Sequence, residues 1–140
     1  MILIADSGST KTDWALISDQ SSVIVATQGI SPVHQSDAQI RQILTNELLP
    51  QLAAADVDAV YFYGSGVRSD KEVPMASLLR ELFPVAEAVE AHSDLLGAAR
   101  ALCGRKEGVV CILGMGSGRT VTVFLSGDAS QSLVPWPTMV

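Results

Sequence analysis

Short apolar runs alternate with polar turns along the first part of the chain, and their spacing predicts three strands. Met1–Ala5 is an apolar run that ends at Asp6, and Trp14–Ile17 and Val23–Thr27 are two further short apolar runs. A parallel crossover needs a dozen or more residues, and the polar linkers between these runs are shorter. The three strands are therefore predicted to form an antiparallel meander.

The spacing of the apolar residues then changes to that of a helix. Ser36 and Gln39 have the separation of a capping box, and the stripe that follows comprises Ile40, Ile43, Leu44, Leu48 and Leu52. Pro50 is expected to end or kink this helix close to its own position. A second helix is predicted from the stripe Met75, Leu78, Leu79, Leu82 and Phe83, and a third over Asp94–Cys103.

Strands are predicted between and after these helices, at Val57–Tyr63, Ala86–Ala91, Val109–Leu113 and Thr120–Leu125. The order is β-β-β-α-β-α-β-α and then β-turn-β, which indicates an α/β fold with a parallel section in its sheet. Val110–Val121 repeats the order of Ile2–Trp14: a strand, a turn of small residues and a strand. We interpret this echo as the start of a second copy of the fold.

Composition and charge exclude several classes of protein. Of the 140 residues 48% are hydrophobic, so the chain can bury a core. A formal charge of −6 argues against binding to nucleic acid or to a membrane surface, which needs a basic face. No apolar stretch approaches the roughly 20 residues of a membrane span, and the N-terminus lacks the basic flank of a signal peptide. We expect a cytoplasmic protein.

The turn from Asp6 to Asp13 carries the most chemistry. A carboxylate at the end of a buried strand could hold Mg²⁺, and Gly8 would let the backbone approach a ligand closely. Backbone N–H groups and the hydroxyls of Ser9, Thr10 and Thr12 could bind phosphate, and Lys11 could neutralise its charge. An ordinary polar hairpin turn is the alternative, and the sequence leaves it open.

Four further segments follow predicted strands. Gly114, Gly116 and Ser117 form a second glycine-rich turn, and Gly64–Gly66 is a tight turn where ligands collect in α/β folds. Asp94 begins a helix at the end of a strand, where it could act as a general base or simply cap the helix. The loop at Ser31–His34 could contact a substrate or only connect a strand to a helix.

Five motifs in order resemble a known family: Asp6–Asp13, Gly29–His34, Tyr61–Gly66, Ser93–Leu102 and Cys111–Gly114. Together they are similar to bacterial N-acetylglucosamine kinase-like proteins of the BadF/BadG/BcrA/BcrD ATPase group, within the actin-like sugar-kinase superfamily. The resemblance implies ribonuclease-H-like domains around a cleft. It also implies transfer of the γ-phosphate of ATP, with Mg²⁺, to a hydroxyl of an amino sugar.

The resemblance also assigns roles by position. Asp6 would organise Mg²⁺, and Asp94 would deprotonate the sugar hydroxyl. The first phosphate loop would comprise Gly8, Ser9, Thr10, Lys11 and Thr12, and the second Gly114, Gly116 and Ser117. The sugar pocket would be lined by Ser31, His34, Gly64, Ser65 and Gly66.

The resemblance fails after Ser117, and Met115 replaces the threonine usual in the second loop. We therefore expect an N-terminal sugar-kinase-like domain at 1–107 and the truncated start of a second domain, with an anomalous tail, at 108–140. Only Arg119 and Asp128 are charged in that second part. Because the adenosine-binding half of the family is missing, this chain is expected to have little kinase activity alone. Its exposed apolar surface would favour self-association, for instance as a homodimer.

Two alternatives remain open at the level of the sequence. One is a dehydratase-activating ATPase of the same superfamily, whose iron–sulfur cluster would need Cys103 and Cys111, the only thiols. The position of Cys111 inside an apolar strand disfavours that alternative. The other is a non-catalytic sugar-sensing module, which would bind the amino sugar without binding nucleotide.

Overall fold

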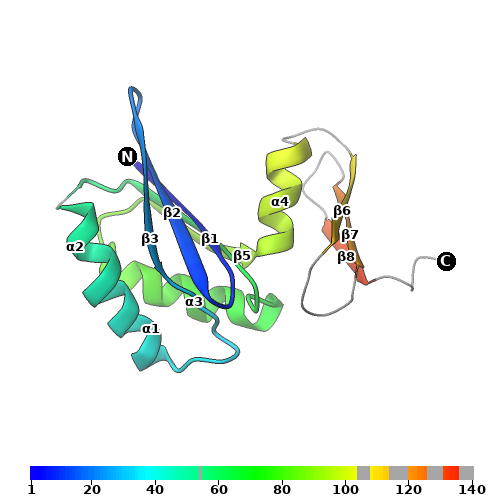
Figure 1. Ribbon diagram of the computed structural model, residues 1–140, viewed down its shortest axis with the longest axis horizontal. Helices are drawn as coiled ribbons and strands as arrows, with labels where there is room; N and C mark the ends of the chain where they lie inside the picture. Colours follow the sequence, from blue (N-terminus) through cyan, green and yellow to red (C-terminus); the bar gives the residue numbers. More distant parts are fainter. Residues whose placement is uncertain (54, 104–107, 114–119, 126–130, 136–140) are drawn as a thin grey trace. The chain divides into compact units, whose positions relative to one another are not determined.

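The computed structural model describes residues 1–53, 55–103, 108–113, 120–125 and 131–135 (Figure 1). The chain divides into two compact units, Met1–Asp94 and Leu95–Val140, and each is described by itself. Within the described residues, no helix combines the length and the apolar character that crossing a membrane requires.

A mixed five-stranded sheet forms the first unit. Its strands are β1 (Ile2–Ser7), β2 (Lys11–Ile17), β3 (Ser22–Gln28), β4 (Ala59–Gly64) and β5 (Ala88–Ser93), in the spatial order β3-β2-β1-β4-β5. The first three are antiparallel, which confirms the predicted meander, whereas β4 is parallel to β1 and β5 is parallel to β4. The α/β class predicted from the sequence is therefore confirmed.

Helices connect the strands where the helical stripes predicted them. They are α1 (Asp37–Ile43), the π-helical turn η1 (Leu44–Leu48), α2 (Leu49–Leu52), α3 (Ser69–Leu82) and α4 (Asp94–Cys103). The predicted capping box of α1 is present, because Gln39 N–H donates to Ser36 Oγ and Ser36 N–H donates to Gln39 Oε1. This box fixes where the chain leaves the preceding loop and enters α1.

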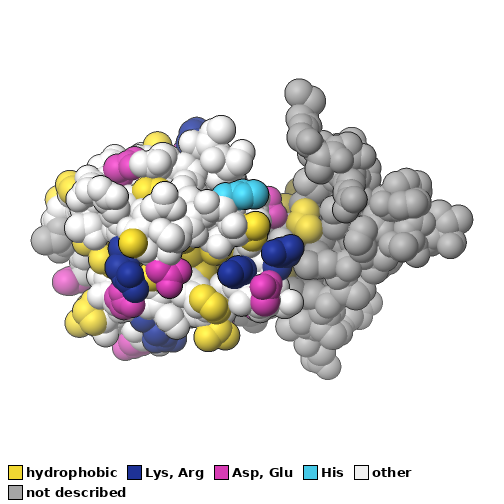
Figure 2. All heavy atoms as spheres, turned by 90° about the horizontal axis from the view of Figure 1, so that it is seen from below, with side chains coloured by type: hydrophobic (Ala, Val, Ile, Leu, Met, Phe, Trp, Pro, Cys, Tyr) yellow, Lys and Arg dark blue, Asp and Glu magenta, His cyan; other side chains and the backbone are white. Residues whose placement is uncertain are grey.

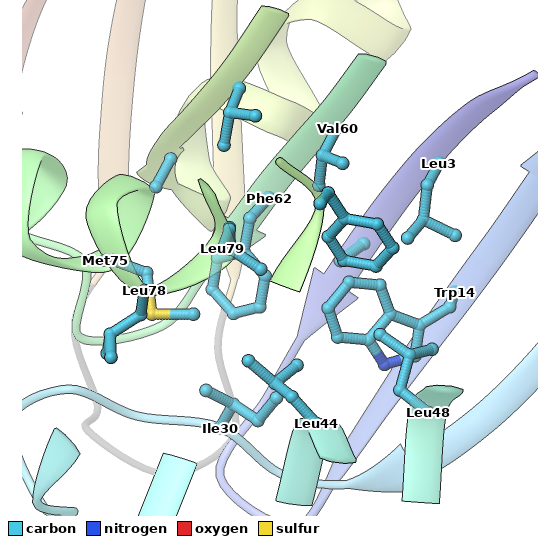
Figure 3. Close-up of a cluster of buried hydrophobic side chains, with 14 of the residues drawn as sticks. Leu3, Trp14, Ile30, Leu44, Leu48, Val60, Phe62, Met75, Leu78 and Leu79 are labelled. Carbon is cyan, nitrogen blue, oxygen red and sulfur yellow. The ribbon is translucent and has the colours of Figure 1, made fainter. Parts of the chain in front are cut away.

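The core lies on one face of the sheet, covered by the helices of both stripes (Figure 3). The Trp14 and Phe62 rings pack at its centre with their centroids 5.8 Å apart. Trp14 Nε1 donates to Thr27 Oγ1 at 3.0 Å, so the indole is buried without an unsatisfied donor. Leu48 and Leu79 pack against these rings from the two helical segments.

The first helix passes Pro50 instead of ending before it. Leu49 N–H donates to the carbonyl of Leu44, five residues back, and the helix ends at Ala53, which has a left-handed φ of 49°. A proline clashes with the carbonyl four residues earlier, and the wider π-helical turn removes that conflict. In place of the expected kink at Pro50, the helix has a π-helical turn that ends two residues before the proline.

An ion pair joins α1 to α3. Arg41 Nε and Nη2 donate to the two carboxylate oxygens of Glu81 at 2.7 and 3.1 Å. Both side chains are about half exposed, and Figure 2 shows that basic and acidic groups are interspersed on the face it displays. The hydrogen bonds from Arg41 lower the pKa of Glu81 below its ordinary value and raise the pKa of Arg41.

Replacement of Arg41 by Gln is expected to return the pKa of Glu81 toward its ordinary value. Because the folded pKa is depressed, the ion pair stabilises the fold above the unfolded pKa of Glu81. That contribution disappears as the pH falls through the lower, folded pKa. Carbon-detected NMR titration of the Glu81 carboxyl in both proteins checks this, and equal titration midpoints would contradict it.

The second unit contains a three-stranded antiparallel sheet in the order β6-β7-β8. Its strands are β6 (Gly108–Leu113), β7 (Thr120–Leu125) and β8 (Gln131–Pro135). The first two were predicted from their apolar runs. The third was not, because it is short and ends in a proline, which usually marks the edge or the end of a strand.

Candidate functional site

The three parallel strands of the first unit end in register. Ser7 of β1 lies opposite Gly64 of β4, which lies opposite Ser93 of β5. The residues that follow these ends are Gly8, Ser65 and Asp94, all of them predicted site residues. Ligands of open α/β sheets bind beyond the carboxyl ends of the strands. The structure therefore gathers the predicted site residues of the first unit at one edge, which we call the carboxyl rim.

The turn after β1 packs against the loop after β3 through Gly29. A Cβ atom at Gly29 would lie 2.4 Å from the Ser9 carbonyl oxygen and 2.6 Å from that of Gly8. Both neighbours are backbone atoms, so only a glycine permits this approach. The first predicted phosphate loop and the predicted sugar loop are thus in direct backbone contact.

Ser7 ties together three segments of the carboxyl rim. Its hydroxyl is buried, donates to the Ile30 carbonyl at 2.9 Å and accepts from Ile30 N–H at 3.1 Å. Thr12 Oγ1 lies 2.7 Å from the same oxygen. The carbonyl of Ser7 accepts from Ser65 N–H at 2.9 Å. One serine therefore sets the positions of the turn after β1, the loop after β3 and the turn after β4.

Gln35 holds the loop after β3 from its other side. Its Nε2 donates to the Gly29 carbonyl at 3.0 Å, and its Oε1 accepts from Ser31 N–H at 2.8 Å. Backbone N–H groups of His34 and Gln35 donate to the Ser31 carbonyl. With Ser7 bonded to Ile30, the loop from Gly29 to Ser31 is fixed residue by residue. Such preorganisation suits a segment that must orient a ligand.

The two predicted sugar-pocket segments meet at Gly66. Its φ of +84° lies in the left-handed region that favours glycine, and an added Cβ would lie 2.6 Å from Ser31 Oγ. Ser31 is buried and His34 is exposed. The structure therefore brings Ser31 to Gly64–Gly66, as the expected pocket requires, and leaves His34 at the surface of the same loop.

Side chains of the phosphate turn point to two sides of the sheet. The side chain of Asp6 is exposed and makes no hydrogen bond or ion pair within the described part of the chain. Lys11 Nζ lies 3.1 Å from Asp13 Oδ1, so its charge is already partly neutralised. Thr12 is buried, and its hydroxyl donates to the Gln28 carbonyl. The hydroxyl expected at phosphate is therefore directed into the fold, whereas Ser9 and Thr10 are exposed.

Two aromatic rings lie level with Asp6 on the neighbouring strands of the sheet, and the sequence did not indicate that they would lie together. Tyr63 and His92 lie on the strands beside it, and their rings stack with centroids 6.2 Å apart. His92 lies 3.6 Å from a Glu72 oxygen and 3.4 Å from a Glu90 oxygen. No group of three or more His, Cys, Asp or Glu side chains in the described ranges is arranged to hold a metal ion.

Asp94 is the first residue of α4 and is half-buried, next to the end of β5. Ser93 Oγ donates to Asp94 Oδ1 at 3.3 Å. The carboxylate follows the strand whose last residue is paired with Gly64, as a group acting on a ligand at the carboxyl rim should. The predicted second phosphate loop, Gly114, Gly116 and Ser117, lies outside the described residues.

No protein-family model and no curated protein matches the chain. A crystal structure described as that of the "putative N-acetylglucosamine kinase" from Porphyromonas gingivalis is 39% identical to it, with a TM-score of 0.84. That match covers 96% of this chain and 47% of the other, so the chain spans about half the length of that protein.

Two structures from Pseudomonas aeruginosa are more distant. One is of YeaZ, at a TM-score of 0.47, and the other is of a protein with similarity to the peptidase YeaZ, at 0.49. Each is 17% identical and covers 96% of this chain, with 67% and 66% of the other chains covered. Neither likeness is strong enough to bear on the fold or the function.

Proposed function

We propose that the chain is the sugar-binding half of an ATP-dependent amino-sugar kinase, of the N-acetylglucosamine type and of the BadF/BadG/BcrA/BcrD group. The observation that carries this proposal is the 39% identity, over 96% of the chain, to the Porphyromonas gingivalis protein. The carboxyl rim supports it independently, because it joins a carboxylate, a polar turn and a fixed loop at one edge of the sheet.

In this proposal the sugar lies over the segments that meet at Gly66. Ser31 and the backbone of Gly64–Gly66 bind and orient its hydroxyl groups, with His34 at the margin. Asp94 accepts the proton of the hydroxyl that attacks, which is the role of a general base. Fixing the loop through Ser7 and Gln35 lowers the entropic cost of holding the sugar in a reactive position.

The residues of the first turn suit the nucleotide. Mg²⁺ is usually bound by one or two carboxylates together with water and phosphate oxygens, and Asp6 offers one exposed carboxylate without a partner in the described residues. Gly8 N–H already donates to the Lys11 carbonyl, so the exposed Ser9 and Thr10 remain as phosphate donors, with Lys11 beside them. The bound nucleotide would supply the γ-phosphate that is transferred.

The domain organisation is part of the same proposal. We take the first unit as a ribonuclease-H-like domain, which its mixed sheet with parallel β1, β4 and β5 supports, and β6-β7-β8 repeats the antiparallel meander of β1-β2-β3. That repetition favours a second domain of the same kind, beginning after residue 107. The iron–sulfur alternative depends on Cys103 and Cys111, whose side chains lie outside the described part of the chain.

The proposal predicts that this chain binds N-acetylglucosamine through Asp94. Asp94→Asn removes the charge that accepts the sugar hydroxyl proton, and the affinity should fall roughly tenfold because a charge-assisted hydrogen bond is lost. Isothermal titration calorimetry of both proteins measures this. Asp19→Asn is the matched control, since Asp19 is an exposed carboxylate in the turn between β2 and β3, at the end of the sheet opposite the carboxyl rim.

Two results would contradict the proposal. One is the absence of heat of binding for N-acetylglucosamine at millimolar concentrations. The other is an affinity that Asp94→Asn and Asp19→Asn change equally.

A further inference from the structure

A polar cavity is lined by residues of the loop after β3, of α1 and of η1. Its volume is about 330 Å³, within the range of small-molecule sites. Four glutamines line it together with one asparagine, one glutamate and one isoleucine: Gln28, Gln35, Gln39, Gln42, Asn46, Glu47 and Ile43. None of the expected sugar or phosphate residues is among them, so this amide pocket is a separate feature.

The side chains that line the amide pocket favour a neutral ligand rich in hydroxyl groups. An amide presents both donors and an acceptor, and so does each hydroxyl of a sugar. No lysine or arginine lines the pocket, so it lacks the cation that a phosphate or carboxylate ligand would need. Ile43, which is buried in the core, is the one apolar residue among those that line the pocket.

Several of these amides are already oriented, and others have unused capacity. Gln39 Oε1 accepts from Ser36 N–H, which leaves its NH₂ group for a ligand. Glu47 accepts from the backbone N–H and the amide of Gln28. Gln42 and Asn46 lie one helical turn apart, and their side chains make no hydrogen bond within the described residues. The pocket therefore combines two side chains that hydrogen bonds hold in place, Gln39 and Glu47, with two that can still bind a ligand, Gln42 and Asn46.

The π-helical turn that accommodates Pro50 lies at the same place. η1 contains Asn46 and Glu47, and it inserts an extra residue into the helix just where the pocket is lined. Short π-helical segments cost stability and occur frequently at functional sites. Glu47 anchors this turn to the end of β3 through Gln28, which holds one wall of the pocket in place.

We infer that the amide pocket binds a neutral polyhydroxylated ligand of about the size of a monosaccharide. The inference does not depend on the proposed kinase activity, because Gln35 alone among the pocket residues enters that mechanism, and only as a support of the sugar loop. Gln35 borders the pocket and also fixes Gly29 and Ser31, so a ligand bound there would contact the support of the sugar loop.

Side-chain amide signals in ¹H–¹⁵N NMR spectra test this site directly. N-acetylglucosamine and glucose serve as probes. They are expected to shift the NH₂ signals of Gln42 and Asn46 in a saturable way, with a roughly millimolar dissociation constant. The double variant Gln42→Ala/Asn46→Ala should lose saturation of the remaining pocket amides, such as Gln39. The control Gln20→Ala, at the exposed turn after β2, should keep it.

The outcomes separate this inference from the proposed function. Backbone shifts at Ser31 and Asp94 with no shift of the Gln39, Gln42 and Asn46 side chains would overturn the amide pocket and leave the kinase proposal intact. Pocket shifts that the double variant leaves unchanged would also overturn it. Pocket shifts without any at the carboxyl rim would support the pocket and contradict the proposed function.

Discussion

Gly29→Ala is expected to destabilise the first unit by about 3 kcal/mol or more, because the added methyl group cannot fit. It would lie 2.4 to 2.6 Å from the Ser9 and Gly8 carbonyl groups, which are backbone atoms of a tight turn and have no side-chain freedom to yield. The turn after β1 and the loop after β3 would have to separate. Urea unfolding followed by Trp14 fluorescence in a Trp136→Phe background measures the loss.

Gly8→Ala is the matched control for this prediction. A Cβ atom at Gly8 would contact only the Lys11 carbonyl oxygen, at an ordinary 3.6 Å, and the residue does not have a positive φ. It should change the free energy of unfolding by less than about 1 kcal/mol. If Gly8→Ala and Gly29→Ala lower the free energy of unfolding by similar amounts, the close backbone contact at Gly29 is not the cause of the destabilisation.

Ser7→Ala is the second substitution expected to have a large effect. It leaves the buried N–H and carbonyl of Ile30 without their partner and removes the group beside Thr12. Unsatisfied buried polar groups each cost about 1–3 kcal/mol, so the combined loss should be about 3 kcal/mol. Sugar affinity should fall as well, because Ser31 follows the residue that loses its anchor.

The control for Ser7→Ala is Ser18→Ala. Ser18 also hydrogen-bonds a carbonyl, that of Ser21, but it does so at the exposed turn between β2 and β3. Its removal should cost less than about 0.5 kcal/mol. If the Ser7→Ala protein is as stable as the Ser18→Ala protein, the buried hydrogen bonds of Ser7 do not hold the loop after β3 in place.

Much of the fold follows from local patterns in the sequence. Short apolar runs located the strands, and the stripe from Ile40 to Leu52 located the first helix, because apolar residues gather where the chain is buried. The capping box could also be predicted, because Ser36 and Gln39 are only three residues apart in the sequence. The π-helical turn was not, since it depends on how a helix accommodates Pro50 while keeping Leu44 and Leu48 in the core.

Less of the candidate site than of the fold could be predicted from the sequence. Asp6 and Asp94 stand at strand ends and could be identified from their positions. Ser7 was overlooked as a positioning residue, although a polar residue at a buried position of a strand is a signal that it has a partner. Its partner, Ile30, is 23 residues away, and only the strand register brings the two together.

The most direct test of the account is a map of N-acetylglucosamine binding on the backbone amides of this chain, by ¹H–¹⁵N NMR titration. We expect the largest changes at the carboxyl rim, at Ser31, Ser65, Gly66 and Asp94. Changes confined to the opposite end of the strands, near Ile2 and Ala59, or no change at saturating sugar, would contradict it.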